Sequence, residues 1–306
     1  MTVESPTSFT FAHWSDYAAL CKPRVVGLIV FTAVIGMFLS TPEGVDIFLL
    51  IAATVGIGLA ATSAAALNHV IDSRADALME RTRNRPLPQG GLTRRHALFF
   101  AITMGVVAMY ILIVFVNALT AALTFASLIG YAVIYTMYLK HATPQNIVIG
   151  GAAGAAPPVL GWSAVTGTVD PHALLLFLII FVWTPPHFWA LAIYRRADYA
   201  KALIPMLPIT HGVTYTRQQI LFYSIILVIV TILPYLTYMS GLIYLAGAIV
   251  LNIVLLFYVV RMQFDHSDGL AMTVFRYSIV YLTLLFCFFF ADHYWSDLSF
   301  FIRNSA

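Results

Sequence analysis

The fold is decided by residues 47–76, which read IFLLIAATVGIGLAATSAAAL at 47–67 and continue directly as NHVIDSRAD at 68–76. The first 21 residues of this stretch carry no charge, and about 20 apolar residues suffice for a helix to cross the hydrocarbon core of a bilayer. Amide and carboxylate side chains begin only where the apolar run ends. The stretch therefore predicts a membrane-spanning helix with polar groups at one end.

Apolar runs of this kind recur along the whole chain. Of its 306 residues, 61% are hydrophobic and only 9% are charged, whereas soluble domains carry about 25% charged residues. Divided at polar or Gly/Pro breaks, the runs predict nine spans. They are residues 25–40, 47–67, 97–116, 118–138, 147–165, 172–193, 220–238, 242–260 and 273–291. We therefore expect an all-α polytopic membrane protein of about nine transmembrane helices, with one membrane-embedded domain over residues 1–306.

Positive charge lies almost entirely on one side of these spans. The N-terminus and the loops after the second, fourth, sixth and eighth spans share that side, which holds 15 of the 16 Lys and Arg residues. Cytoplasmic loops carry such an excess of positive charge. We therefore expect the N-terminal segment (1–24) in the cytoplasm and the C-terminal tail (292–306) in the periplasm. A bacterial inner (plasma) membrane is favoured because the N-terminus has no transit-like pattern.

Three polar residues at the end of the second span share one helix face. Asn68, Asp72 and Asp76 are spaced by four residues, and each step of four advances a helix by about 400°. One face therefore offers an amide and two carboxylates. Mg²⁺ prefers a few carboxylates together with phosphate oxygens and water. The pattern predicts a metal site at Asn68, Asp72 and Asp76, at the edge of the membrane.

An arginine cluster and a rigid Pro86-Leu-Pro88 follow this face directly. Arg81 and Arg85 are candidates to hold a diphosphate, because planar guanidinium groups match its oxygens with paired hydrogen bonds. The alternative is that Asp72 and Asp76 merely pair with Arg74, Arg81 or Arg83 on a wet helix end. Both interpretations remain open from the sequence.

Further candidate residues lie near later spans. Lys140 and Asn146 lie at the same membrane edge and could serve the diphosphate. His187 lies inside an apolar span, where a polar group indicates either a functional site or a bond to a carbonyl freed by the neighbouring prolines. Arg196-Ala-Asp198 echoes Arg74-Ala-Asp76, which is consistent with a weak internal duplication or with chance.

Several motifs follow one another in a specific order. They are Lys22-Pro-Arg, Asn68/Asp72/Asp76 with Arg81-Thr and Arg85-Pro-Leu-Pro, Thr143-Pro-Gln-Asn-Ile-Val-Ile-Gly-Gly, Trp183-Thr-Pro-Pro-His-Phe-Trp-Ala-Leu-Ala, and Asp198-Tyr with Pro205-Met-Leu-Pro. The aspartate-rich motif resembles the first such motif of the UbiA-type prenyltransferases. From Lys22 to Gly212 the motifs more narrowly resemble a branch of that family, the protohaem IX farnesyltransferases (haem O synthases).

The resemblance implies nine helices around a central cavity and a Mg²⁺-dependent transfer of farnesyl from farnesyl diphosphate to a vinyl group of haem b. Water is added, which gives haem O and diphosphate. The implied catalytic residues are Asn68, Asp72, Asp76, Arg81 and Arg85, and the implied substrate-binding residues are Lys140, Asn146, His187, Tyr194, Arg196 and Asp198. The family's second aspartate-rich motif is replaced here by His187, Tyr194 and Asp198, so this region lacks a carboxylate pair.

Two other functions are compatible with parts of the pattern. A prenyltransferase of the same superfamily could act on a quinone precursor or a chlorin. A nine-helix transporter is a second alternative, although the polar residues gather at one membrane face instead of the midplane. The expected partners are the lipid bilayer, farnesyl diphosphate, haem b and a haem-modifying enzyme or terminal oxidase that receives the product. No nucleic acid is expected.

Overall fold

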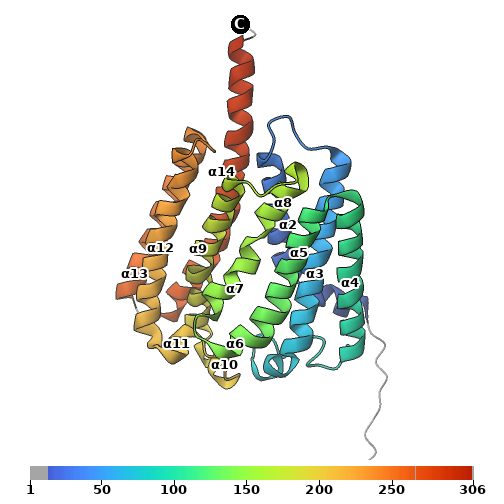
Figure 1. Cartoon of the computed structure of the whole chain (residues 1–306). Coiled ribbons are helices and arrows are strands. Elements are labelled where there is room, and N and C mark those ends of the chain that lie inside the picture. Colours follow the sequence, from blue (N-terminus) through green and yellow to red (C-terminus); the bar gives the residue numbers. More distant parts are fainter. Residues whose placement is uncertain (1–12, 266, 305–306) are drawn as a thin grey trace, which may run out of the picture.

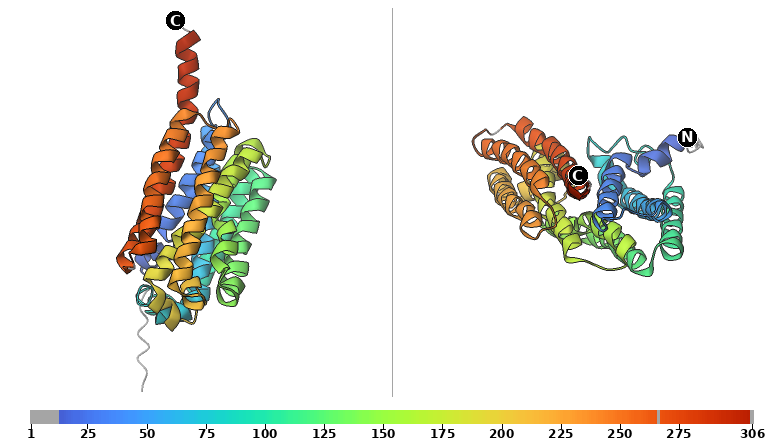
Figure 2. Two further views of the ribbon diagram at one scale, coloured as in Figure 1. Left: turned by 90° about the vertical axis from the view of Figure 1, so that its left-hand side faces the viewer. Right: turned by 90° about the horizontal axis from the view of Figure 1, so that it is seen from above.

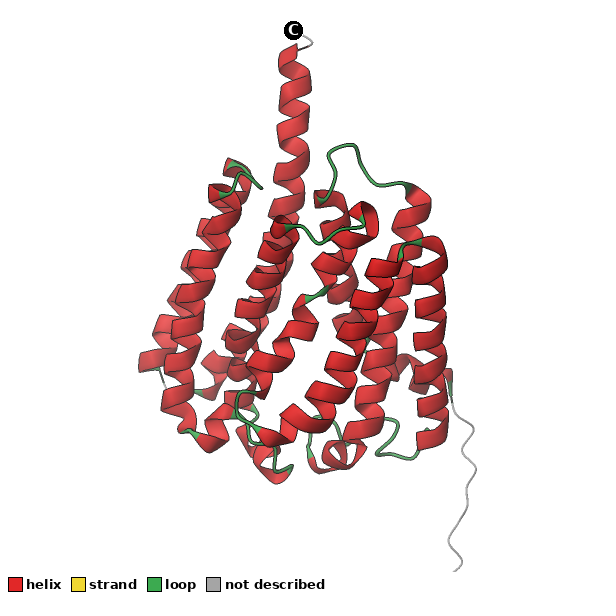
Figure 3. Ribbon diagram, in the orientation of Figure 1, coloured by secondary structure: helices red, strands yellow, loops and turns green. Residues whose placement is uncertain are grey.

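The computed structural model describes residues 13–265 and 267–304, and within these ranges the chain is helical with no strand (Figure 3). The helices are α1 (Trp14–Leu20), α2 (Pro23–Leu39), α3 (Ile47–Leu78), α4 (Arg94–Phe115), α5 (Ala118–Ile129), the π-helix η1 (Gly130–Leu139), α6 (Lys140–Ala142), α7 (Asn146–Ala155), α8 (Pro157–Thr166), α9 (Pro171–Tyr194), α10 (Arg196–Lys201), α11 (Leu207–Thr210), α12 (Gly212–Leu236), α13 (Leu242–Phe264) and α14 (Asp268–Asn304).

The predicted membrane spans are confirmed. In the described residues, 8 helices are long and apolar enough to cross a membrane, and the number is nine when the pair α1–α2, bent by 51°, is counted as one span. The predicted break between the third and fourth spans is explained by Asn117. Its Oδ1 accepts a hydrogen bond from the Thr120 N–H at 2.8 Å, which caps α5, and its Nδ2 donates to the Ser163 carbonyl at 2.9 Å.

The second span is longer than predicted. The apolar run predicted a span that ends at residue 67, and α3 continues without a break through residues 68–78 to Leu78, so that the shared helix face of Asn68, Asp72 and Asp76 is present. This segment contains no Gly or Pro that would end a helix. Asn68, Asp72 and Asp76 are buried on α3 and bonded to other elements. The connecting loop therefore begins at Met79, and the polar face belongs to a rigid helix.

The spans form a ring in which neighbours in the chain are neighbours in space. Each helix contacts the next in the series α2, α3, α4, α5, η1, α7, α9, α12, α13 and α14. The last of them, α14, also contacts α2. The view from above shows the helices end-on around this circuit, and the side views show them aligned (Figures 1 and 2). The first and last spans therefore close the ring.

Glycines allow α2 and α8 to approach each other closely. A Cβ atom at Gly36 of α2 would collide with the Pro158 carbonyl of α8, and a Cβ at Gly161 of α8 would collide with the Ala33 carbonyl of α2. Small residues are typical of such helix contacts in membranes. The short connections at the lower end of Figure 1, which include α6, α10 and α11, lie at the same end of the molecule as the polar end of α3.

Candidate active site

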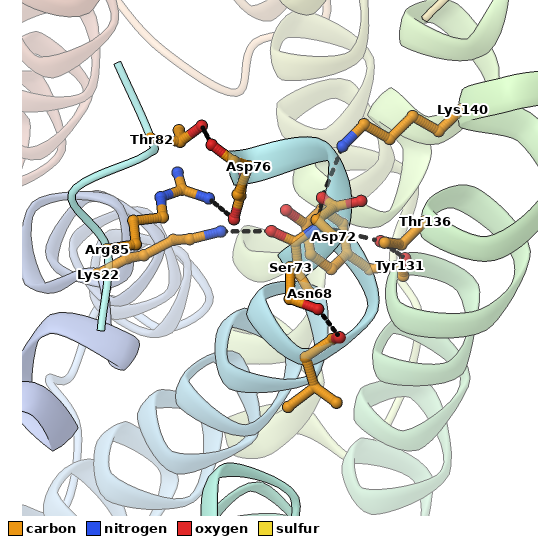
Figure 4. Close-up of polar contacts among 11 residues, drawn as sticks. Lys22, Asn68, Asp72, Ser73, Asp76, Thr82, Arg85, Tyr131, Thr136 and Lys140 are labelled. Carbon is orange, nitrogen blue, oxygen red and sulfur yellow. Dashed lines mark hydrogen bonds and ion pairs between the residues drawn. The ribbon is translucent and has the colours of Figure 1, made fainter. Parts of the chain in front are cut away.

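The polar end of α3 carries the predicted amide and carboxylates on one buried face. Asn68, Asp72 and Asp76 are each exposed by no more than 5%. Figure 4 shows cationic side chains from the loops and the neighbouring helices converging on this face. Charged groups are costly to bury unless they are paired, so the arrangement of their partners determines the site.

Asp72 lies at the centre of these contacts. Its Oδ2 accepts hydrogen bonds from Lys140 Nζ at 2.6 Å and from Asn68 Nδ2 at 2.7 Å. Its Oδ1 is buried and has no hydrogen-bond partner among the described residues. One carboxylate oxygen is therefore fixed by the protein, while the other has capacity for a ligand.

Asp76 holds the loop that follows α3. Its Oδ2 forms an ion pair with Arg85 Nη1 at 2.6 Å, and its backbone carbonyl accepts a hydrogen bond from Thr82 Oγ1 at 2.9 Å. The alternative pairing with nearby arginines is wrong for the described residues. Arg74, Arg81 and Arg83 are exposed there and form no ion pair with either carboxylate. The partners come from more distant positions, because α3 continues past Asp76 and the loop folds back onto it.

Lys22 is part of the site, although the sequence analysis gave it no role. It precedes Pro23, has a left-handed backbone with φ of 46°, and donates from Nζ to Asn68 Oδ1 at 2.5 Å. A residue before proline is disfavoured in the right-handed helical region, so Lys22 marks the bend between α1 and α2. The Lys-Pro pair ahead of the first span was the available signal.

The π-helix η1 lines the opposite side of the site. Thr136 Oγ1 donates to the Tyr131 carbonyl at 2.8 Å and accepts from Asn68 Nδ2 at 3.4 Å. The rings of Tyr131 and Tyr135 stack at 5.5 Å. π-helical segments are rare and are frequent at functional sites. Hydrophobic periodicity cannot distinguish this segment from an α-helix, so the sequence analysis missed it.

The second loop reaches the site through α10. The Tyr199 side chain is buried and interacts electrostatically with Arg81, Arg85, Asp198 and Asp72, which places charges of both loops around it. Burial raises the pKa of the Tyr199 phenol, and the two guanidinium groups oppose that increase. The phenol therefore stays protonated at neutral pH and can donate a hydrogen bond. Asp198 is itself buried, with Oδ2 3.7 Å from Arg195 Nη1.

Besides Arg81 and Asp198, four predicted residues form no hydrogen bond or ion pair with the α3 face among the described residues. Arg196 pairs with the exposed Asp268 at 2.5 Å, and the Tyr194 ring lies 5.1 Å from the Arg195 guanidinium. Asn146 Nδ2 donates to the Thr143 carbonyl at 2.7 Å, within its own turn. The fourth residue, His187, faces α14.

His187 is held rigidly between α9 and α14. Its Nδ1 is 2.7 Å from Ser278 Oγ, and its ring stacks on Trp183 at 4.3 Å and on Phe275 at 4.5 Å. Trp183 Nε1 donates to the Ser278 carbonyl at 2.8 Å. Nε2 of His187 has no hydrogen bond to any described residue. The alternative of a bond to a carbonyl freed by the prolines is not what the structure shows.

An apolar cavity lies beside η1. It has a volume of about 370 Å³ and is lined by residues of α5, η1, α7, α8 and α9, together with Ala156 and Val169. Gly130, at the start of η1, lines this cavity, whereas Thr136 of the same π-helix contacts Asn68 at the polar site. The π-helix thus connects an apolar space with the buried carboxylates and cations.

Comparison with known proteins identifies this combination. The model of the UbiA prenyltransferase family matches residues 29–280, most of the chain. The chain belongs to the UbiA prenyltransferase family. The family predicted from the motifs is thereby confirmed, and the apolar spans make this UbiA prenyltransferase a multi-pass membrane protein.

Similar UbiA proteins are found both by sequence and by structure. The chain is 60% identical over 281 residues to "Protoheme IX farnesyltransferase" of Methylococcus capsulatus, covering 92% of this chain and 94% of that protein. It is 58% identical to the protein of the same name from Nitrosococcus oceani, with 92% and 94% covered. These relatives extend over almost the whole chain.

Solved structures share the fold at low identity. The structure described for digeranylgeranylglyceryl phosphate synthase in membranes has a TM-score of 0.76 at 17% identity, covering 92% of this chain and 98% of that one. A UbiA homologue from Archaeoglobus fulgidus bound to GPP and Mg²⁺ has a TM-score of 0.64 at 17% identity, with 91% and 99% covered. At this identity the likeness shows the UbiA fold alone.

The donor set of this UbiA site suits a small hard cation. Within residues 13–265 and 267–304, no three His, Cys, Asp or Glu side chains gather as a metal site. The α3 face instead offers two carboxylates and an amide, with the buried Oδ1 of Asp72 lacking a partner. Mg²⁺ is commonly bound by one or two carboxylates with phosphate oxygens and water completing its shell, so these residues fit it.

Proposed function

We propose that the chain transfers a farnesyl group from farnesyl diphosphate to a vinyl group of haem b, with addition of water, giving haem O and diphosphate. The observation that carries this proposal is the 60% identity, over 94% of its length, to a protein named Protoheme IX farnesyltransferase. The polar face of α3 supports it, because it places cations and carboxylates where a diphosphate and a metal can bind together.

In this proposal Asp72, Asp76 and Asn68 hold Mg²⁺. The unpartnered Oδ1 of Asp72 is the best placed donor, and the Mg²⁺ named with GPP in the Archaeoglobus fulgidus homologue supports the choice of metal. When bound, Mg²⁺ supplies positive charge that stabilises the departing diphosphate. Arg81, with its exposed side chain, is free of ion pairs among the described residues and can turn towards the same anion.

The chemistry begins with heterolysis of the allylic C–O bond. The bonding electron pair leaves with the diphosphate, where Arg85 and Lys140 stabilise the added negative charge. The vinyl π electrons of haem b then form the new C–C bond to the farnesyl carbon. The resulting cation beside the porphyrin is captured by water, which loses one proton and becomes the hydroxyl group.

The protein contributes orientation and exclusion of bulk water to these steps. The apolar cavity next to η1 offers space for part of a hydrophobic substrate. His187 keeps Nε2 without a bond to the described residues while Ser278 fixes Nδ1, so we assign His187 a contact with haem. Asp198 and Tyr199 reach the site from α10, whereas Arg196, through its pair with Asp268, fixes α10 to α14.

The proposed setting is a cell inner membrane with the polar end of α3 on the cytoplasmic side. Lys140, Arg85 and Lys201 all lie at the end of the molecule that contains α6, α10 and the loop after α3 (Figure 1). An excess of such residues is typical of cytoplasmic loops. The product is a modified haem, so its recipient is a haem-modifying enzyme or a terminal oxidase.

An acceptor competition tests the proposal. The purified protein is incubated with farnesyl diphosphate, Mg²⁺ and equal amounts of haem b and 4-hydroxybenzoate, and both acceptors are analysed by mass spectrometry. Haem should gain the mass of a farnesyl group plus a hydroxyl group while the benzoate stays unmodified. Farnesylation of the benzoate with unmodified haem would refute the haem assignment and favour a quinone precursor.

Metal removal tests the second part of the proposal. Excess EDTA should stop product formation, and an excess of Mg²⁺ over the chelator should restore it. Without the metal, the two carboxylates of the α3 face would repel the diphosphate, because both groups are negatively charged. Unchanged turnover in EDTA would contradict the metal assignment and leave the acceptor assignment to the competition experiment.

A further inference from the structure

His69 is a buried imidazole that has no hydrogen-bond partner in the part of the chain that the structure describes. Its side chain is 2% exposed, and both Nδ1 and Nε2 are buried with no partner among the described residues. A neutral imidazole has one N–H donor and one acceptor nitrogen. Buried polar side chains in folded proteins are almost always hydrogen-bonded. The unpaired ring therefore indicates a partner outside the described part of the chain, and a bound ligand is such a partner.

The position of His69 connects it to the polar site. It follows Asn68 directly and precedes Asp76 by seven residues. Seven residues make almost two full helical turns, so the His69 and Asp76 side chains leave α3 in directions about 20° apart, with a rise of about 10 Å between them. The charges of Lys22 and Arg85 both act on its ring. Lys22 is bonded to Asn68, and Arg85 is bonded to Asp76. His69 therefore lies alongside both cation contacts of the α3 face.

The surroundings of the ring specify the chemistry of the missing partner. Lys22 and Arg85, bonded to Asn68 and Asp76 on the same helix face, disfavour a metal ion at the His69 nitrogen and favour an anion. An anion that accepts the His69 N–H would also be attracted by Lys22 and Arg85. The diphosphate of the proposed donor substrate is such an anion, and it has several oxygens that can accept hydrogen bonds at once.

We propose that His69 donates its N–H to a non-bridging oxygen of the substrate diphosphate. This inference rests on the proposed function for the identity of the prenyl donor. The imidazole N–H orients the diphosphate, and after the C–O bond breaks the same N–H remains bonded to the released diphosphate. In this proposal α3 contacts the substrate in two ways: its carboxylates hold the metal, and His69 donates a hydrogen bond to the diphosphate.

Binding of inorganic pyrophosphate to the full-length protein tests this proposal. We would measure the Kd in detergent with Mg²⁺ present, by calorimetry, for the wild type and for His69→Leu, His69→Gln and His96→Leu. A lost hydrogen bond to a charged group should weaken binding on the order of 10- to 100-fold in His69→Leu. His69→Gln retains a donor and should recover most of the affinity. His96 is exposed on α4, so its variant should bind normally.

Thermal unfolding separates this role from a structural one. Because His69→Leu removes an unpaired buried polar group, the ligand-free Tm should stay equal or rise, while the Tm increase caused by pyrophosphate should shrink. A ligand-free Tm that falls in both His69 variants, or unchanged pyrophosphate affinity in His69→Leu, would overturn the proposal. Weakened haem binding with unchanged pyrophosphate affinity would also overturn it, since the contact would then belong to a haem carboxylate.

This measurement is independent of the acceptor. Pyrophosphate contains neither the isoprenoid nor haem, so a protein that leaves haem unmodified would contradict the proposed function without altering the comparison between His69 variants. Conversely, normal pyrophosphate binding by His69→Leu in a protein that farnesylates haem would refute only the role of His69.

Discussion

At the scale of single residues, the site depends on how two buried carboxylates divide their oxygens. Asp72 Oδ2 is fixed by Lys140 and Asn68, whereas Asp76 Oδ2 is fixed by Arg85. A buried charge left without its partner is strongly destabilising, while replacement of both charges by apolar groups is much less so. The ion pairs therefore contribute to stability mainly because they leave no buried charge at the site without its partner.

The pair Asp76–Arg85 gives an asymmetric prediction. The Asp76 side chain is 1% exposed and that of Arg85 is 20% exposed. Arg85→Leu should lower the free energy of unfolding by about 3 kcal/mol. Asp76→Leu should lower it by less, because the remaining guanidinium can reach water. Unfolding of each purified variant in a denaturing detergent measures both effects.

The double variant is the control for this pair. Asp76→Leu with Arg85→Leu should be more stable than the sum of the single effects predicts, because it leaves no unpaired charge. Strictly additive effects would show that the two groups do not interact in solution.

Local spacing allowed three members of the site to be predicted, and tertiary contacts account for those that were missed. Asn68, Asp72 and Asp76 repeat every four residues, so helix geometry alone places them together. Lys22 and Tyr199 reach the same face from positions far away in the chain. Nothing local in the sequence specifies which distant cation or phenol will fold against a given helix.

At the scale of elements, the packing of α7 against η1 holds the tyrosines at the site. A Cβ atom at Gly150 would collide with the ring of Tyr135, whereas a Cβ at Gly154, one turn further along α7, would meet nothing within 4 Å. The two glycines therefore form a matched pair with different packing. Only Gly150 is required for the close approach.

Alanine substitution at these two positions should have opposite effects. Gly150→Ala should destabilise the protein by about 1–3 kcal/mol through overpacking and should slow transfer, because Tyr135 must move. Gly154→Ala should be neutral or stabilise by up to about 1 kcal/mol, since alanine favours helix. Tm and turnover of both variants test this, and equal stability would contradict the packing account.

Hydropathy predicted where helices cross the membrane, since a span has a fixed minimum length. It did not predict that α3 continues to Leu78, because polar residues end a hydrophobic run whether or not they are buried. It also did not predict η1, whose apolar composition suits an α-helix equally well. Helix ends and π-helical turns depend on side-chain partners from other elements.

At the scale of the whole molecule, the ring of spans puts every site-bearing connection at one end. The loop after α3, α6 and α10 all lie at the end of the molecule where Lys22 begins α2 (Figures 1 and 2). The number of spans and the distribution of charge allowed this sidedness to be predicted. The circular order of the helices could be expected only from the resemblance, because hydropathy does not specify which helices are neighbours.

The orientation can be tested with single cysteines. In a background of Cys21→Ser and Cys287→Ser, cysteine replaces either Glu80, after α3, or Glu43, at the opposite end; both positions are exposed. A membrane-impermeant maleimide added to intact spheroplasts should label Glu43→Cys and not Glu80→Cys. Disruption of the membrane should make both reactive. The reverse pattern in intact spheroplasts would contradict a cytoplasmic site.

The central claim is that the polar face of α3 drives farnesyl transfer to haem b, and turnover of Asp72→Ala tests it most directly. Wild type, Asp72→Ala and the control Glu43→Gln would be incubated with haem b, farnesyl diphosphate and Mg²⁺, with haem products quantified by mass spectrometry. Wild type and control should yield haem heavier by a farnesyl group plus a hydroxyl group. Asp72→Ala should be slower on the order of 100- to 1000-fold, as after loss of one preorganised electrostatic group. Normal turnover in Asp72→Ala, or unmodified haem with wild type, would contradict the account.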